Sequence, residues 1–328
     1  MRQWYQSALM LGLLSAPCGV AMADEAWNIF SLSTGYRQDS LDWNIAGNSA
    51  GTSPNVLSEL EWRDLDILQL RGEVLSMNAN RLYFRGAAGF GLVLDGENQD
   101  SDFAGDNRSL EFSRSVNGVD GSSVVDLSGA LGRSYAFGEG GRHFIAPLLG
   151  LSYHRQQMRM KDGQQVLSDA DNAHVLDPGL DPYPVGAIPG LDSSYDAQWW
   201  GPWLGMDVQW DLLDKGTAFA RLEAHWVEYF GEANWNLRDD LAHPVSFEHE
   251  TDGSGWVMEL GWRNRFSGDG WVWGAGVSLA QWQTNAGVAR TYFTDPAPPC
   301  NGDCYGETRL NEVNWLSRSI NFTLSKDL

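Results

Sequence analysis

The chain has 328 residues and a formal net charge of −21, from 43 acidic and 22 basic residues. So acidic a balance argues against nucleic-acid binding, because phosphate contacts need basic patches. Its 16 tryptophans, 10 tyrosines and 37 glycines, without long helical periodicity, indicate β-structure.

The N-terminus has the features of an export signal. Met1-Arg2 is followed by a short apolar stretch from Ala8 to Leu14 and then by Ala21-Met22-Ala23. A basic end, a short apolar middle and an A-x-A ending are typical of a signal peptide, and the apolar part is too short to span a bilayer. We therefore expect residues 1–23 to be a cleaved signal peptide and residues 24–328 to form one domain.

Alternating apolar and polar positions predict long strands. From Arg81 to Asp95 the even positions are apolar or small, and the odd positions include charged residues. The same period of two recurs in 59–74, 204–211 and 256–265. Strands of soluble proteins are usually five or six residues long, whereas membrane barrel strands need about ten.

The connections alternate between short and long, as in outer-membrane barrels. Short turns are predicted at Met77–Asn80, Gly138–Arg142, Asp214–Gly216 and Ser267–Gly270, and long polar stretches at roughly 40–54, 96–120, 161–194, 236–253 and 284–311. The strands between them number ten, and the last runs from Asn314 to Leu328. The pattern predicts an all-β, ten-stranded antiparallel transmembrane β-barrel in a Gram-negative outer membrane, with long acidic extracellular loops and short periplasmic turns. A soluble β-sandwich is the alternative.

A ten-stranded barrel is narrow, and its interior should be filled by side chains. The alternation assigns charged residues of both signs to this interior: Glu59, Glu61, Arg63, Arg71, Glu73, Arg81, Arg85, Arg221, Glu223, Glu259, Arg263 and Arg265. Charges of both signs at this density should pair in a salt-bridge network. A selective path for an ion or solute is the alternative, and either interpretation places function in the long loops.

Other chemical motifs are sparse. Cys300 and Cys304 are the two cysteines of the expected mature chain, with three residues between them, and an oxidising periplasm should close them into a disulfide. No metal ligands are grouped nearby, and no cofactor motif is present. Ser152 and His154 share a strand face, as in a barrel lipase, but the sequence shows no third group to orient them.

Four short motifs resemble the omptins, the ten-stranded proteases of the outer membrane. They are Ser58-Glu-Leu-Glu-Trp62, Gly86-Ala-Ala-Gly89, Pro202-Trp-Leu-Gly205 and Trp226-Val-Glu228. They follow one another in family order over most of the expected mature chain, while the long loops match poorly. The resemblance implies a protease site at the outer rim, where carboxylates and a histidine activate water.

The resemblance supplies the first catalytic pair as Asp100 and Asp102. Counting without a gap from Trp226, the second pair falls on Ala233 and Trp235, and neither side chain can exchange a proton at neutral pH.

Substitutes for the second pair lie further along the chain. Asp240 and His243 are shifted candidates, and His249 is another. The resemblance also implies that Asp39 receives basic side chains of a substrate and that lipopolysaccharide binds the barrel.

The leading hypothesis is an omptin-like barrel without a complete protease site, displaying acidic loops for binding. The alternatives are an active omptin-type endopeptidase cleaving at basic residues, and a narrow channel. The expected partners are outer-membrane lipid, lipopolysaccharide and basic peptides or proteins, with no nucleic acid, cofactor or metal.

Overall fold

The computed structural model describes residues 26–265, 270–294 and 304–327. The strands are β1 (Trp27–Ile45), β2 (Ser58–Met77), β3 (Leu82–Gly105), β4 (Ser109–Gly118), β5 (Ser123–Arg133), β6 (Tyr135–Phe137), β7 (His143–Ser168), β8 (Gly186–Ala187), β9 (Asp192–Asp211), β10 (Thr217–Asn234), β11 (Phe247–Arg265), β12 (Trp271–Thr284), β13 (Gly287–Tyr292) and β14 (Tyr305–Asp327). The helical elements are α1 (Ala170–Ala173) and the 3-10 turns η1 (Asp106–Arg108), η2 (Glu139–Gly141) and η3 (Leu213–Lys215). The expected signal peptide and most of the turn at 267–270 lie outside the described residues.

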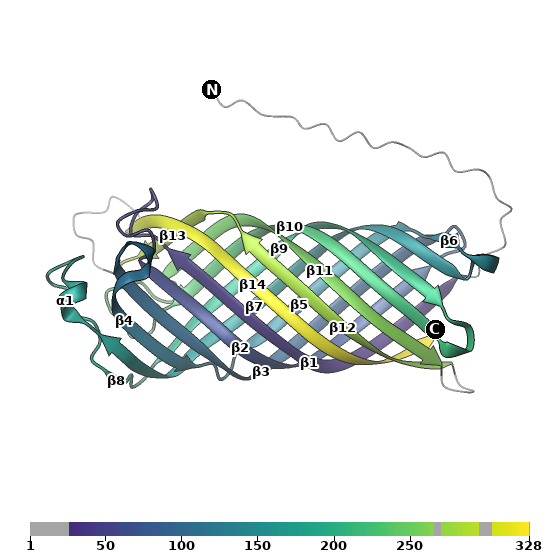
Figure 1. The fold of residues 1–328 in the computed structure, drawn as a ribbon, viewed down its shortest axis with the longest axis horizontal. Coiled ribbons are helices and arrows are strands. Elements are labelled where there is room, and N and C mark those ends of the chain that lie inside the picture. Colours follow the sequence, from purple (N-terminus) through teal and green to yellow (C-terminus); the bar gives the residue numbers. More distant parts are fainter. Residues whose placement is uncertain (1–25, 266–269, 295–303, 328) are drawn as a thin grey trace, which may run out of the picture.

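The strands close into a ring of ten, as the sequence predicts. β4 and β5 together occupy one place between β3 and β7, and β12 and β13 together occupy one place between β11 and β14. Closure comes from β1 and β14, which pair antiparallel from Ile29 opposite Asp327 to Ile45 opposite Leu310. Figure 1 shows a long barrel whose strands are tilted relative to its axis, with α1, β4, β8 and β13 at one end and β6 at the other.

An apolar belt covers the outside of the barrel. Large apolar side chains that point outward from many strands are exposed, among them Phe30, Leu32, Leu70, Phe90, Leu92, Leu149, Leu151, Leu204, Leu222, Leu260, Val277, Ile320 and Phe322. Exposed apolar surface of this extent is unfavourable in water and favourable in lipid. The belt therefore marks the membrane-spanning part of each strand. No helix of the described part is long and apolar enough to cross a membrane.

The barrel continues beyond the belt at the end that carries α1. We call this the outer end, and a position nearer to it is described as above another. β3 runs to Gly105 and β7 to Ser168, and β11 starts at Phe247. Much of the polar sequence predicted as loops is therefore strand, and this part of the prediction was wrong. Strands above the membrane need no apolar outward face, so they lack the alternation by which strands are recognised.

A bulge in β2 changes which side chains point inward. The pairing with β1 shifts register by one residue, from Asp39 opposite Leu65 to Leu41 opposite Trp62, and Asp64 in this stretch has a φ of +50°. Side-chain direction alternates along a strand, so a shift of one residue exchanges the two faces. Leu60 and Trp62, 1% and 0% exposed, point inward above the bulge.

The assignment of Glu59, Glu61 and Arg63 to the lumen was therefore wrong. They stand on the outer face opposite Leu60 and Trp62. Below the bulge Glu73, Arg85, Arg221 and Arg263 are buried inside the barrel, as predicted. The assignment of Arg81 and Arg265 to the lumen was wrong, because Arg81 precedes β3 and Arg265 is exposed at the end of β11.

An aromatic layer fills the lumen from the upper part of the belt outward. It consists of side chains that are 0–3% exposed: Trp43, Trp62, Tyr195, Trp199, Tyr229, Trp282 and Trp315. Trp43 of β1 lies 5.7 Å, between ring centroids, from Tyr195 of β9, although these strands are not neighbours in the sheet. The contact therefore crosses the lumen. Trp282 and Trp315 stack at 5.4 Å.

Adjacent tryptophans of β9 allow a test of this layer. Trp199 is 0% exposed in the lumen, and Trp200 is 50% exposed on the outside. Trp199→Ala should lower the free energy of unfolding by about 3–5 kcal/mol, because it leaves a cavity in the layer. Trp200→Ala is the matched control and should cost less. The two are compared by urea unfolding of the refolded barrel in lipid vesicles, and equal losses would show that the lumen at Trp199 is not packed.

Candidate functional site

Asp100 and Asp102 lie on the inner face of β3, above the apolar belt. They pair with Leu60 and Ser58 of β2, on the face that the bulge turns inward. Both are half-buried, and Oδ1 of Asp100 is buried without a hydrogen-bond partner in the described part of the chain. Burial is the main cause that raises the pKa of both carboxyls, to about 6 for Asp102. For Asp100, the neighbouring Asp102 raises the pKa further.

A guanidinium also acts on this pair of carboxyls. Arg238 lies in the loop between β10 and β11, where Asp240 holds it at 2.8 and 2.7 Å. Its positive charge lowers the pKa of Asp100 and of Asp102, which places it within electrostatic range of both. A guanidinium stays protonated in proteins, so Arg238 cannot act as a general base.

The shifted substitutes for the second pair do not join the aspartates. Asp240 is bound to Arg238. His243 is exposed, and its Nδ1 lies 2.8 Å from Oδ1 of Asn234. Among the described residues, neither makes a hydrogen bond or ion pair with Asp100 or Asp102.

The remaining candidates for the second pair lie within the packed interior. Ala233 is 1% exposed, and Trp235 packs edge-on against Phe247 at 4.6 Å. His249 is 1% exposed, with its Nδ1 at 2.9 Å from the hydroxyl of Tyr195. Burial lowers the pKa of His249 to about 3, so this imidazole is neutral and shielded from water.

Asp39, expected to receive a basic side chain of a substrate, is engaged inside the barrel instead. Its carboxylate accepts two hydrogen bonds from Arg37, at 2.7 and 2.6 Å, and one from Nε1 of Trp315 at 3.0 Å. The side chain is fully buried. A basic group from outside cannot reach it in this arrangement.

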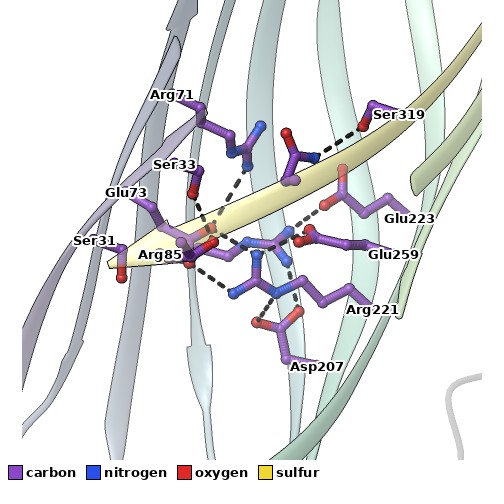
Figure 2. A network of polar contacts seen from close by, with 12 residues as sticks. Ser31, Ser33, Arg71, Glu73, Arg85, Asp207, Arg221, Glu223, Glu259 and Ser319 are labelled. Carbon is purple, nitrogen blue, oxygen red and sulfur yellow. Dashed lines mark hydrogen bonds and ion pairs between the residues drawn. The ribbon is translucent and has the colours of Figure 1, made fainter. Parts of the chain in front are cut away.

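At the level of the membrane the lumen holds an ion-pair network, shown in Figure 2. Arg85 contacts Asp207 at 2.7 Å and also binds Glu223. Arg221 contacts Glu73 at 2.6 Å and Glu259 at 3.0 Å. These charges come from β2, β3, β9, β10 and β11, so they hold opposite walls of the barrel together. The mixed-charge lumen predicted from the sequence is present.

A serine, a histidine and a carboxylate meet beside this network. Oγ of Ser152 lies 3.2 Å from Nδ1 of His225, and Nε2 of His225 lies 2.9 Å from Glu223. The sequence instead paired Ser152 with His154, which binds Asp126 at 2.7 Å. The signal was missed because Ser152 and His225 are 73 residues apart.

The triad is packed rather than open to a substrate. The ring of His225 stacks on Trp203 at 5.6 Å and meets Trp282 edge-on at 4.5 Å. Ser152 is buried and does not line the neighbouring cavity. A nucleophile must reach the reacting carbon, so we interpret this triad as structural.

Two other predictions concern cysteines and metals. Cys300 lies outside the described residues, so the disulfide with Cys304 stays a prediction. The described residues contain no group of three or more His, Cys, Asp or Glu side chains that could hold a metal ion.

Comparison with known proteins supports the fold. The outer membrane protease OmpT from Escherichia coli matches with a TM-score of 0.67 and 12% identity, covering 92% of this chain and 97% of that chain. The translocator domain of the autotransporter NalP from Neisseria meningitidis gives a TM-score of 0.34 and 9% identity, covering 90% and 88%. No curated protein matches the sequence. At this identity, the likeness to OmpT shows a shared barrel fold.

The sequence also matches a family of outer-membrane proteins. The model of the family described as "Pom: Protochlamydia outer membrane protein" matches residues 31–328, which is nearly the whole chain. The family description agrees with the closed barrel and its apolar belt. The chain belongs to the Protochlamydia outer membrane protein family.

Proposed function

We propose that this protein is an omptin-like outer-membrane barrel that binds cationic ligands at its outer end and does not cleave them. The observation that carries the proposal is the position of Arg238, a permanent cation within electrostatic range of Asp100 and Asp102. An omptin-type mechanism needs a histidine opposite the carboxylates to take a proton from water. Of the nearby histidines, His243 contacts Asn234 through its Nδ1, and His249 is buried.

An acidic loop supports the binding of cations. Residues 169–191 contain four aspartates and neither lysine nor arginine. The loop is fixed in place, because Oδ1 of Asp169 accepts the backbone N–H of Asn172 at 3.0 Å and Ala173 packs in an apolar cluster with Phe112. A preorganised loop loses little entropy on binding, and its charge attracts cations from a distance.

The aromatic layer supports the same interpretation. Its side chains pack together in the lumen below Asp100 and Asp102, which favours binding at the outer end over passage through the barrel. The omptin-type endopeptidase and the narrow channel are the alternatives. Binding of lipopolysaccharide stays a prediction from the resemblance.

A short arginine-rich peptide tests binding. Fluorescence anisotropy should show that the refolded barrel binds labelled tetra-arginine, with affinity falling as salt rises. Asp171→Asn, Asp177→Asn and Asp181→Asn together should weaken binding about tenfold, since exposed charge pairs contribute about 0.2–1 kcal/mol each. Glu139→Gln, at the opposite end, is the control and should change nothing. Equal affinity of the triple variant and the wild type would contradict a binding role for this loop.

Cleavage is measured on the same preparations. Wild-type barrel should cut Arg-Arg and Lys-Lys peptides no faster than the Asp100→Ala, Asp102→Ala double variant. A clearly faster wild type whose activity is lost in His243→Ala would show a working protease with a displaced histidine.

The raised pKa of Asp102 predicts how pH affects stability. Folding favours the protonated carboxyl, so the stability that this group contributes is full below its unfolded pKa of about 3.9 and is lost as pH rises through about 6. Asp102→Asn keeps the neutral form at every pH. At pH 8 the free energy of unfolding of the variant should therefore exceed that of the wild type by at most about 3 kcal/mol. This limit follows because each unit of pKa difference between the folded and unfolded states corresponds to about 1.4 kcal/mol.

The measurement is urea unfolding at pH 4 and pH 8, and the difference between variant and wild type should vanish at pH 4. Asp239→Asn, at an exposed carboxylate in the loop that carries Arg238, is the control. A difference of the same size at both pH values would show that Asp102 is ionised in the folded state at pH 4.

A further inference from the structure

Arg263 is a buried guanidinium without an acidic partner. It is 9% exposed, and within the described residues it makes no hydrogen bond or ion pair. Its guanidinium lies over the ring of Phe219, 5.1 Å from the ring centroid. Arg221 is stacked on the same ring at 5.0 Å but contacts three carboxylates. Arginine cannot escape burial by losing its proton, and an unpaired buried charge is costly. The donors of Arg263 therefore find no acceptor among the described residues, and the acceptor has to come from water or from a bound ligand in the lumen.

These donors face a cavity of about 130 Å³ at the centre of the barrel. This volume is several times what one water molecule needs. Five arginines and four carboxylates line it, and Asp207 lies behind them against Arg85. The carboxylates are therefore sufficient in number to balance the charge. Asp39, which does not line the cavity, pairs with Arg37, so six carboxylates counter these five arginines. They are distributed unevenly, because three of the six contact Arg221.

Arg71 is the second arginine with donors to spare. Its side chain is 34% exposed to the lumen, and its ion pair with Glu73 is long, at 3.6 Å. Both oxygens of Glu73 already accept from Arg221, at 2.6 and 2.8 Å. Figure 2 shows Glu73 between the two arginines.

Arg263 and Arg71 stand at the two ends of one row across the inner wall. Arg263 is opposite Gly274, Gly274 opposite Thr323, Thr323 opposite Ser33, and Ser33 opposite Arg71. Cross-strand partners point to the same face of a sheet, so all five face the lumen. The hydroxyls of Ser33 and Thr323 contact each other at 2.8 Å.

Gly274 makes room in this row. A Cβ at this position would lie 2.9 Å from Cγ of Arg263, so a larger residue would displace the arginine. The row therefore presents two guanidiniums on either side of a floor of two hydroxyls. Guanidiniums and hydroxyls together are the donors that bind tetrahedral oxyanions in proteins.

We propose that the barrel holds one small oxyanion, of the size and charge of inorganic phosphate, between Arg71 and Arg263 over the hydroxyls of Ser33 and Thr323. The oxyanion accepts the donors that the carboxylates leave unfilled. Because the aromatic layer closes the lumen above this site, the anion enters before the barrel is complete or from the opposite end.

Retention of labelled phosphate tests the site. The full-length mature barrel is refolded with radiolabelled phosphate, so that access through the closed lumen does not limit occupancy, and is then passed through a desalting column. Wild type should retain about one phosphate per barrel. Arg263→Gln and Arg71→Gln should each retain at least tenfold less, whereas Arg290→Gln, at an outer ion pair with Glu250 and Glu307, should retain as much as wild type.

Two further measurements keep the test decisive if an arginine variant fails to fold. The first is a gel assay: a folded barrel migrates more slowly after it has been heated, so this shift reports that the variant had folded. The second uses the double variant Ser33→Ala, Thr323→Val, which removes the hydroxyl floor and keeps every charge. That double variant should lose retention while still folding. Three results would each overturn the proposal. The first is that wild type retains no phosphate, and the second is that Arg263→Gln retains as much phosphate as wild type. The third is that chloride displaces the phosphate as effectively as sulfate does at the same ionic strength.

Discussion

Closure of a narrow barrel is the constraint on which the rest of this structure depends. Once β1 pairs with β14, the inward side chains of ten strands share one small space. They must match one another in volume where they are apolar and in charge where they are ionised. The aromatic layer satisfies the first requirement in the outer part of the lumen. The network around Arg85 and Arg221 satisfies the second at the level of the membrane.

The candidate site at the outer end follows from the same constraint. The interior beneath Asp100 and Asp102 is packed, and His249, which meets Trp43 of the layer edge-on, is part of that packing. What remains open to solvent is the rim and the loops. A barrel of this kind can keep the fold of OmpT while the residues at the outer end serve binding instead of proton transfer. Fold alone does not settle chemistry, which depends on the groups at the site.

Much of the fold could be predicted from the sequence, because apolar alternation records which strand face meets lipid. The number of strands and the mixed-charge lumen follow from it. The inversion at Asp64 could not be predicted, since a bulge adds one residue without leaving an apolar signal. The strands beyond the belt were read as loops for a similar reason: both of their faces are free to be polar.

The site was predicted less well, because its contacts join distant segments. Asp100 and Asp102 are adjacent positions on one strand face and are recognisable as a motif. The approach of Arg238, the meeting of Ser152 with His225, and the unequal sharing of carboxylates between Arg221 and Arg263 depend on closure of the ring. The burial of Asp39 could not be predicted, because its partner Trp315 lies on β14, which only closure of the ring brings beside β1.

The central claim is that side chains close the lumen, and single-channel recording tests it most directly. Purified wild-type barrel is inserted into a planar lipid bilayer, and insertion is confirmed by recovering heat-modifiable protein from the membrane. A closed lumen predicts no stepwise current above the baseline of the bilayer. Large, regular conductance steps from the wild-type protein would contradict the account and show that the aromatic layer leaves an open path.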